Sequence, residues 1–120
     1  MITGIGLDLC EVSRMQKHLK DDRFLNRFFT AEETEYIRSK GASAAQTLAG
    51  IFAAKEALGK ALGTGIAFDL KEAEIRHDLN GCPYYQMNGL LSERVPEEHL
   101  FLSITHDGGV SAAVCIREKL

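Results

Sequence analysis

One long helical segment in the middle of the chain constrains the fold more than any other feature. It begins at residues 43–46, Ser-Ala-Ala-Gln, which match a capping box, and ends at Gly63, a residue typical of helix C-termini. Large apolar side chains recur within it at helical spacings: Leu48, Ile51, Phe52, Leu58 and Leu62. This stripe predicts that the helix faces a hydrophobic core.

Strand patterns lie on both sides of this helix. In residues 2–9, apolar side chains alternate with Gly4, Gly6 and Asp8, which is the period of a strand. Residues 73–77 alternate too, and Asn80-Gly81 predicts a two-residue hairpin turn into a partner strand over residues 84–87. Residues 100–105 and 110–117 predict a final hairpin around Asp107-Gly108-Gly109.

Shorter helices are predicted over residues 12–20, from a capping box at Thr30 to Glu33, and over residues 89–95 before Pro96. The order of elements indicates an α+β fold, a mostly antiparallel sheet packed against a long helix. With 120 residues and no visible linker, we expect one domain over residues 1–120.

Composition narrows the class of protein. Hydrophobic residues make up 45% of the chain, which is typical of a globular domain, and no apolar run is long enough to span a membrane. The net charge of −3 argues against binding nucleic acid through bulk positive charge. Three widely spaced cysteines favour neither a zinc site nor a disulfide framework, so we expect a cytoplasmic protein.

Asp8 is the first candidate for chemistry. It follows Gly4 and Gly6 on one strand face, where the missing side chains let another group approach the backbone closely. The alternative is an aspartate that begins a turn at a strand end.

The long helix carries the second candidate. Ala49, Ala53, Glu56 and Lys60 share a face outside the apolar stripe, which predicts a shallow floor of small residues with polar groups at one end. The alternative is an exposed Glu–Lys surface pair at i, i+4.

Asp8 and Glu56 are more informative together. Two carboxylates suit a hard cation such as Mg²⁺, which fills its other positions with water and phosphate oxygens. Lys60, one helical turn from Glu56, provides a point charge for a phosphate. The sequence therefore suggests a metal and phosphate site, provided that the strand and the helix meet.

Two further features involve His106 and a basic block. His106 lies where a strand meets a Gly-rich turn and is a candidate base or phosphate ligand; the alternative is an ordinary turn residue. The other histidines lie among charged residues, and we expect them to be solvated.

Residues 14–27 have a local charge of +3 from Arg14, Lys17, Lys20, Arg23 and Arg27 against two aspartates. Such a block predicts an anionic partner, with a solvated helix face as the alternative.

Several motifs in order resemble the small bacterial holo-[acyl-carrier-protein] synthases, a family of 4′-phosphopantetheinyl transferases. The most specific is Phe52-Ala-Ala-Lys-Glu-Ala57 with Lys60 and Gly63-Thr-Gly65. The others are Ile5-Gly-Leu-Asp8 with Arg14, residues 23–33, Asn80-Gly81 with Pro83, and Ser103-Ile-Thr-His106.

The resemblance implies the 4′-phosphopantetheinyl transferase fold, a reaction and an assembly. Such enzymes transfer the phosphopantetheine arm of coenzyme A to a serine of apo-acyl carrier protein, in support of fatty acid biosynthesis, and release adenosine 3′,5′-bisphosphate. Members commonly form homotrimers with active sites at subunit boundaries. The basic block, with Arg14, Lys17, Arg23 and Arg27, then becomes the expected docking surface for the acidic carrier protein.

Individual roles follow from the matched positions. The family's Mg²⁺ ligands correspond to Asp8 and Glu56, and Lys60 corresponds to a phosphate contact. His106 is implied as a coenzyme A contact or as the base, the other candidate base being a water held by Glu56. Lys55, Gly63, Thr64 and Gly65 are also expected near coenzyme A; Lys55 must extend outward or find a partner at a subunit boundary.

Two positions depart from the family pattern. Ile51 stands where an arginine is usual, and Cys82 stands where many members have lysine. Ile51 fits the apolar stripe, so we expect it to pack in the core. Two other functions stay open on the residues alone: a metal-dependent nucleotide hydrolase, and a non-catalytic module that binds acidic carrier proteins through the basic block.

Overall fold

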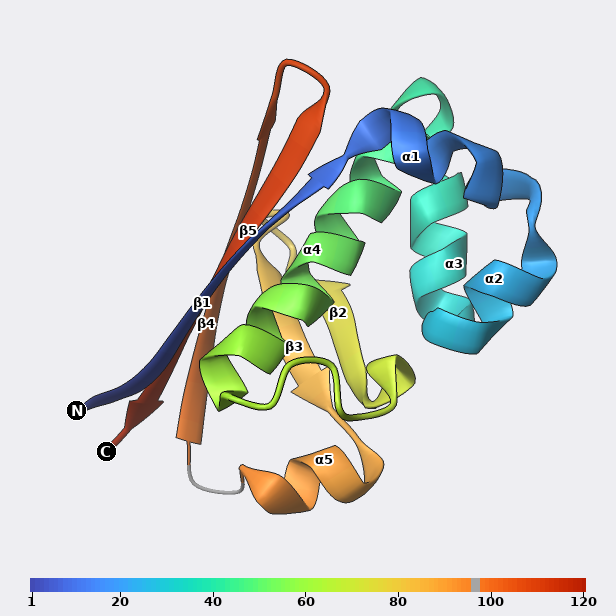
Figure 1. Cartoon of the computed structure of the whole chain (residues 1–120). Helices are drawn as coiled ribbons and strands as arrows, with labels where there is room; N and C mark the ends of the chain where they lie inside the picture. Colours follow the sequence, from blue (N-terminus) through green and yellow to red (C-terminus); the bar gives the residue numbers. More distant parts are fainter. Residues whose placement is uncertain (96–97) are drawn as a thin grey trace.

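The long helix predicted from the sequence is α4, Ala44–Leu62, and the other elements pack around it (Figure 1). The structure, a computed structural model, describes residues 1–95 and 98–120. Gly63 ends α4 with a φ of 77°, in the left-handed region, as predicted. Ser43 is the N-cap residue, but its side chain makes no capping hydrogen bond, so the predicted capping box is wrong there.

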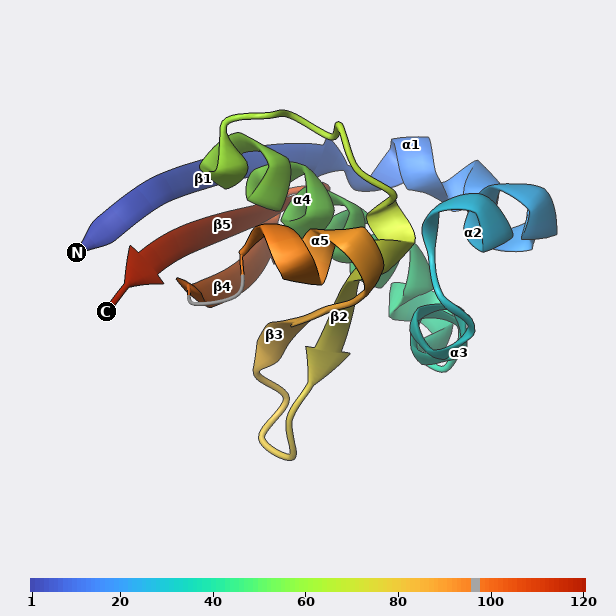
Figure 2. The same ribbon diagram turned by 90° about the horizontal axis from the view of Figure 1, so that it is seen from below.

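A three-stranded antiparallel sheet covers one side of α4 (Figures 1 and 2). Its order is β1, Ile2–Glu11, then β5, Val110–Lys119, then β4, Glu98–Asp107. The predicted first strand and the final hairpin are therefore confirmed, and each strand is longer than its pattern indicated. The central strand comes from the C-terminus, so it brings residues from both ends of the chain together.

A second, two-stranded sheet projects away from α4 (Figure 2). It consists of β2, Ala73–His77, and β3, Pro83–Met87, which pair antiparallel. The predicted two-residue turn is wrong, because His77 pairs with Pro83 and five residues connect them. The Asp78 carboxylate organises this wider loop by accepting hydrogen bonds from the backbone N–H groups of Asn80 and Cys82, at 2.8 and 2.9 Å.

Short helices fill the remaining surface. The capping box at Thr30 is confirmed: the Thr30 hydroxyl accepts from the Glu33 N–H at 3.1 Å, and the Glu33 carboxylate accepts from the Thr30 N–H at 3.0 Å. The helix over Asp22–Phe28 has no counterpart among the predicted elements. The α-helices are α1, Val12–Gln16; α2, Asp22–Phe28; α3, Ala31–Arg38; and α5, Gly89–Arg94. The 3-10 helices are η1, Lys17–Lys20; η2, Gly41–Ser43; and η3, Leu70–Glu72. Helix α5 matches the predicted segment, while Pro96, expected to stop it, lies outside the described residues.

Small residues allow β1 and α4 to pack closely against each other. A Cβ at Gly4 or Gly6 would clash with the backbone carbonyl of Ala61 or Ala57, so the group that approaches these glycines is α4 itself. The interpretation of Ala49 and Ala53 as an open floor is wrong, since both are completely buried. The glycines and alanines instead let the strand lie directly on the helix.

The opposite face of the large sheet is apolar and open to solvent. Ile5, Leu7 and Leu9 of β1 point to this face and remain more than 60% exposed, and Phe101 of β4 is also exposed. Contiguous apolar surface of this kind is typical of an interaction face. Among the described residues, no helix is both long and apolar enough to cross a membrane.

Candidate active site

The contact between β1 and α4 brings Asp8 and Lys60 together, although 52 positions separate them in sequence. Lys60 Nζ lies 3.1 Å from Asp8 Oδ1 and donates a second hydrogen bond to the Leu7 carbonyl at 2.9 Å. The Asp8 side chain is 17% exposed and the Lys60 side chain 53%. The predicted meeting of strand and helix is therefore present.

Glu56 belongs to the same cluster. Burial raises the pKa of the Glu56 carboxyl, the negative charge of Asp8 raises it further, and the charges of Lys60 and Arg14 act to lower it. The negative charge of Asp8 thus acts on Glu56, which places the two carboxylates within electrostatic reach of each other. No group of three or more histidine, cysteine or acidic side chains suited to a metal gathers within residues 1–95 and 98–120.

Arg14 connects this cluster to the basic block. It lies in α1, directly after β1, and its charge acts on the Glu56 carboxyl. All five basic residues of the block, Arg14, Lys17, Lys20, Arg23 and Arg27, are exposed. The two aspartates of the block are engaged elsewhere: Asp21 caps α2 and Asp22 pairs with Arg38 at 2.6 Å. The charge of Arg38, from outside the block, therefore offsets that of Asp22.

His106 lies apart from this cluster, at the edge of a hollow. In the sheet, Asp8 pairs with Ala113, which pairs with Ile104, and His106 follows two residues later on β4. Standard strand dimensions put the backbones of Asp8 and His106 roughly 12 Å apart. His106 is exposed and borders a hollow of about 240 Å³. The other lining residues include Gln46, Thr47, Gly50, Ile51, Gly81, Pro83 and Ser111.

Ile51 packs as the apolar stripe predicted. It is 1% exposed and forms part of the wall of the same hollow. A neighbouring hollow of about 440 Å³ shares Tyr36, His77 and Gly81 with the first.

The expectation that His77 is solvated is wrong, because its ring stacks on Tyr36 at 4.1 Å between centroids and is half-buried. His18, stacked on Phe24 at 3.8 Å, also departs from that expectation.

The Gly63–Thr64–Gly65 turn borders the site without offering a backbone cradle. The N–H of Gly63 donates to the Lys60 carbonyl, and those of Thr64 and Gly65 both donate to the Gly59 carbonyl. These donors cap the end of α4, so they are not available to a phosphate in this conformation. All three residues are exposed.

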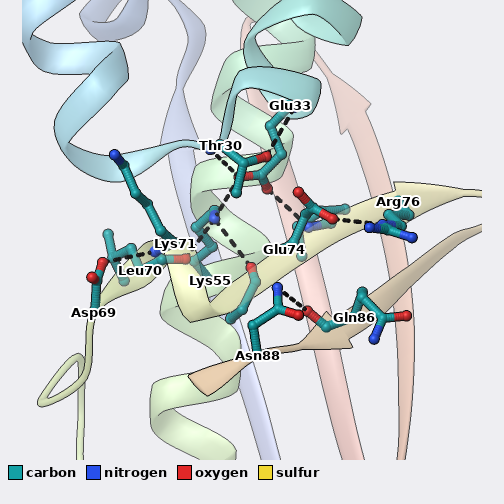
Figure 3. A network of polar contacts seen from close by, with 12 residues as sticks. Thr30, Glu33, Lys55, Asp69, Leu70, Lys71, Glu74, Arg76, Gln86 and Asn88 are labelled. Carbon is teal, nitrogen blue, oxygen red and sulfur yellow. Dashed lines mark hydrogen bonds and ion pairs between the residues drawn. The ribbon is translucent and has the colours of Figure 1, made fainter. Parts of the chain in front are cut away.

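Lys55 occupies a different place from the one that the sequence suggested. Its side chain is completely buried, and Nζ donates to Glu33 Oε1 at 2.9 Å and to the Leu70 and Ala73 carbonyls at 2.7 and 3.1 Å (Figure 3). All three ammonium protons thus have acceptors within its own chain. The expected contact with coenzyme A is withdrawn, as is the need for a partner at a subunit boundary.

Glu33 completes this buried network. Its carboxylate accepts from Lys55 Nζ, from the Thr30 N–H and, through Oε2, from the Ile75 N–H at 2.8 Å (Figure 3). Burial raises the pKa of Glu33 and lowers that of Lys55, and the charge of each partner opposes that shift. The network joins α3, α4 and β2. Sequence reasoning missed it, although the capping-box glutamate was visible as one half of the pair.

Comparison with known proteins agrees with this geometry. A family model described as the 4′-phosphopantetheinyl transferase superfamily matches residues 4–115. The chain belongs to this superfamily. The residues that meet at the β1–α4 contact are those that the resemblance assigned to metal and phosphate.

Curated relatives that match over nearly their whole length are named holo-[acyl-carrier-protein] synthase. The holo-[acyl-carrier-protein] synthase of Treponema denticola is 46% identical over 98% of this chain and 99% of its own length. That of Caldicellulosiruptor saccharolyticus is also 46% identical, over 99% of this chain and 98% of its own.

Solved structures of the superfamily share the fold. The crystal structure of the holo-[acyl-carrier-protein] synthase from Neisseria meningitidis has a TM-score of 0.89 and 32% identity, over 99% of this chain and 100% of the other. A synthase from Bacillus anthracis, solved in complex with CoA (3′,5′-ADP), has a TM-score of 0.84 and 35% identity, over 100% and 99%. The predicted α+β transferase fold is therefore confirmed.

Proposed function

We propose that this chain is a holo-[acyl-carrier-protein] synthase. It transfers the 4′-phosphopantetheine group of coenzyme A to a serine of apo-acyl carrier protein, in support of fatty acid biosynthesis, and releases adenosine 3′,5′-bisphosphate. The observation that carries the proposal is the cluster of Asp8, Glu56 and Lys60 at the β1–α4 contact. Names of relatives matched over the full chain support it. We retain the prediction of a single domain over residues 1–120.

Asp8 and Glu56 would hold Mg²⁺. The donor set fits, because two neighbouring carboxylates offer the hard oxygen ligands that Mg²⁺ takes, and it prefers to share its remaining positions with phosphate and water. When bound, Mg²⁺ supplies charge stabilisation for the pyrophosphate of coenzyme A.

The chain's own cations complete the phosphate site. Phosphoryl transfer needs positioning and charge stabilisation more than covalent help, and Lys60 provides a solvent-accessible ammonium beside the carboxylates. His106 and its hollow lie roughly 12 Å from Asp8 by strand dimensions, so a substrate that contacts both must be extended. Coenzyme A has that form. Gly63, Thr64 and Gly65 border the Lys60 end of this path.

Two groups are proposed as alternatives for the base that accepts the serine proton. One is a water held by Glu56, and the other is His106. The separation of His106 from the carboxylates favours the Glu56-bound water if the serine attacks next to the metal, and favours a coenzyme A contact for His106. The His106→Ala variant distinguishes them, since loss of a contact raises KM, whereas loss of the base lowers kcat.

Partner surfaces follow from charge and from apolar exposure. Arg14, Lys17, Arg23 and Arg27 form the proposed docking surface for an acidic carrier protein, with Arg14 nearest the carboxylates. The exposed Ile5, Leu7 and Leu9 favour the homotrimer, with active sites at subunit boundaries, since burying this face would remove apolar surface from water. A cytoplasmic location fits this function.

The decisive test combines apo-acyl carrier protein, coenzyme A and MgCl₂ with the protein. We expect the mass of the carrier to increase by that of the phosphopantetheine arm, and the Asp8→Ala and Glu56→Ala variants to lose this activity. Glu93→Ala, an exposed change on α5, is the matched control and should stay active. Bisphosphate release without carrier would indicate a nucleotide hydrolase, and carrier binding that is unaffected by chelation, without mass gain, would indicate a binding module.

A further inference from the structure

Lys60 holds one of the two carboxylate oxygens through which a divalent cation could bind Asp8. Its ammonium contacts Asp8 Oδ1 at 3.1 Å and is held in place by the Leu7 carbonyl at 2.9 Å. Two acceptors define one position for a side chain that is 53% exposed. Since an ammonium and a metal ion are attracted by the same carboxylate oxygens, they compete for Asp8.

The charges around Asp8 strengthen this competition. The charges of Asp8, Lys60 and Arg14 all act on Glu56, and Lys60 also pairs with Asp8. The four formal charges cancel. A divalent cation is drawn to a site mainly by negative charge, so a neutral cluster attracts it weakly.

A pyrophosphate changes this balance. Its oxygens carry more negative charge than one carboxylate, so they attract the ammonium away from Asp8. Lys60 can follow, because a lysine has a flexible four-carbon stem and this one is half exposed. Its departure frees Asp8 Oδ1 for a cation, while the pyrophosphate adds ligands of its own.

We propose that Lys60 makes cation binding depend on substrate: it holds Asp8 in the free protein and releases it when the coenzyme A pyrophosphate arrives. Cation and coenzyme A then bind cooperatively, and by linkage each raises the affinity for the other by the same factor. The inference rests on the proposed function, from which it takes the cation and the substrate.

Calorimetric titration of the free protein with MgCl₂, and then with MnCl₂, tests whether Lys60 competes with the cation when coenzyme A is absent. The Lys60→Gln variant should bind either cation about tenfold more tightly than the unmodified protein, because one nearby positive charge is removed. Lys60→Arg keeps the charge and should bind weakly. Lys119→Gln removes an equal charge from an exposed position at the end of β5 and should leave the affinity unchanged.

The same titrations at saturating coenzyme A test whether the bound substrate removes this competition. The advantage of Lys60→Gln should disappear there, so that the coupling between cation and coenzyme A is about tenfold smaller in the variant. An unchanged or weaker cation affinity of free Lys60→Gln would overturn the inference, as would equal coupling in both proteins. Transfer activity of the unmodified protein reports separately on the proposed function. Absence of cation binding in every variant, with or without coenzyme A, would contradict both this inference and the metal assignment.

Discussion

Two lysines of α4, five residues apart, each pair with a carboxylate from another element, and the two pairs behave differently. Lys55 and Glu33 lie 2.9 Å apart with both side chains completely buried. Lys60 and Asp8 lie 3.1 Å apart with side chains 53% and 17% exposed. The distances are nearly equal, so the difference lies in the surroundings.

The buried pair is saturated and the exposed pair is not. Each ammonium proton of Lys55 and both oxygens of Glu33 have partners inside the chain, which fixes α3, α4 and β2 relative to one another. Lys60 has two acceptors, and water reaches it. A saturated buried pair therefore serves structure, whereas a pair open to solvent can exchange its partner for a substrate.

The largest expected effect is loss of stability in Lys55→Met. Removing this cation leaves the Glu33 carboxylate buried without its counter-charge, which typically costs about 3–5 kcal/mol. Urea unfolding at fixed protein concentration measures the change. Lys60→Met, the same substitution five residues on, is the matched control and should cost less than about 1 kcal/mol. Equal losses in the two variants would contradict the comparison.

The next effect is on catalysis, and here the Lys60 variant, not the stability-impaired Lys55 variant, is the informative one. Lys60→Met should lower kcat for carrier modification by about 100-fold, because it removes a charge aimed at the phosphate. Its unfolding midpoint should hardly move. Measurement follows the mass of the carrier over time, with Lys119→Met as the control for a lost surface charge. A Lys60→Met protein with normal kcat would remove Lys60 from the phosphate site.

Much of the exposed site could be predicted from the sequence. Asp8, Glu56 and Lys60 fall on regular faces of a strand and a helix, so their period alone suggests a cluster once the two elements meet. Gly63 and the capping box at Thr30 also act locally and were read correctly. Local chemistry and periodicity are the information that a single sequence contains.

The buried pair could not be predicted in the same way. Lys55 and Glu33 are 22 residues apart, and two of the Lys55 acceptors are backbone carbonyls, which every residue has. The prediction for Gly4 and Gly6 is confirmed only in part, for a related reason: their pattern shows that another group comes close, but not that this group is α4. Likewise, the alanine face of α4 resembles an open floor until β1 and β5 cover it.

A smaller effect is the difference in coupling free energy between the Lys55–Glu33 and Lys60–Asp8 ion pairs. In a double-mutant cycle with Glu33→Gln and Lys55→Met, we expect a coupling free energy of about 2 kcal/mol, since either change leaves the other group buried. The cycle with Asp8→Asn and Lys60→Met should give about 0.2–1 kcal/mol because solvent screens the exposed ion pair. Urea unfolding of the four variants in each cycle gives both values. Coupling of equal size would mean that burial does not distinguish the pairs.

The smallest effect concerns the cost of keeping Glu56 ionised in the free protein. Burial and the charge of Asp8 raise the pKa of Glu56 in the folded state, so its contribution to stability is present below the unfolded pKa, near 4.5, and is lost as pH rises through the folded value. Glu56→Gln should therefore stabilise the cation-free protein at pH 7, by less than about 1 kcal/mol since the group is partly solvated. The gain should vanish below about pH 4.5, where the carboxyl is protonated in both states. Glu93→Gln, an exposed change on α5, is the control for the loss of a surface carboxylate. Urea unfolding across this range in the presence of a chelator measures both, and a Glu56→Gln variant less stable than the unmodified protein at pH 7 would show that Glu56 contributes to the fold rather than costing it stability.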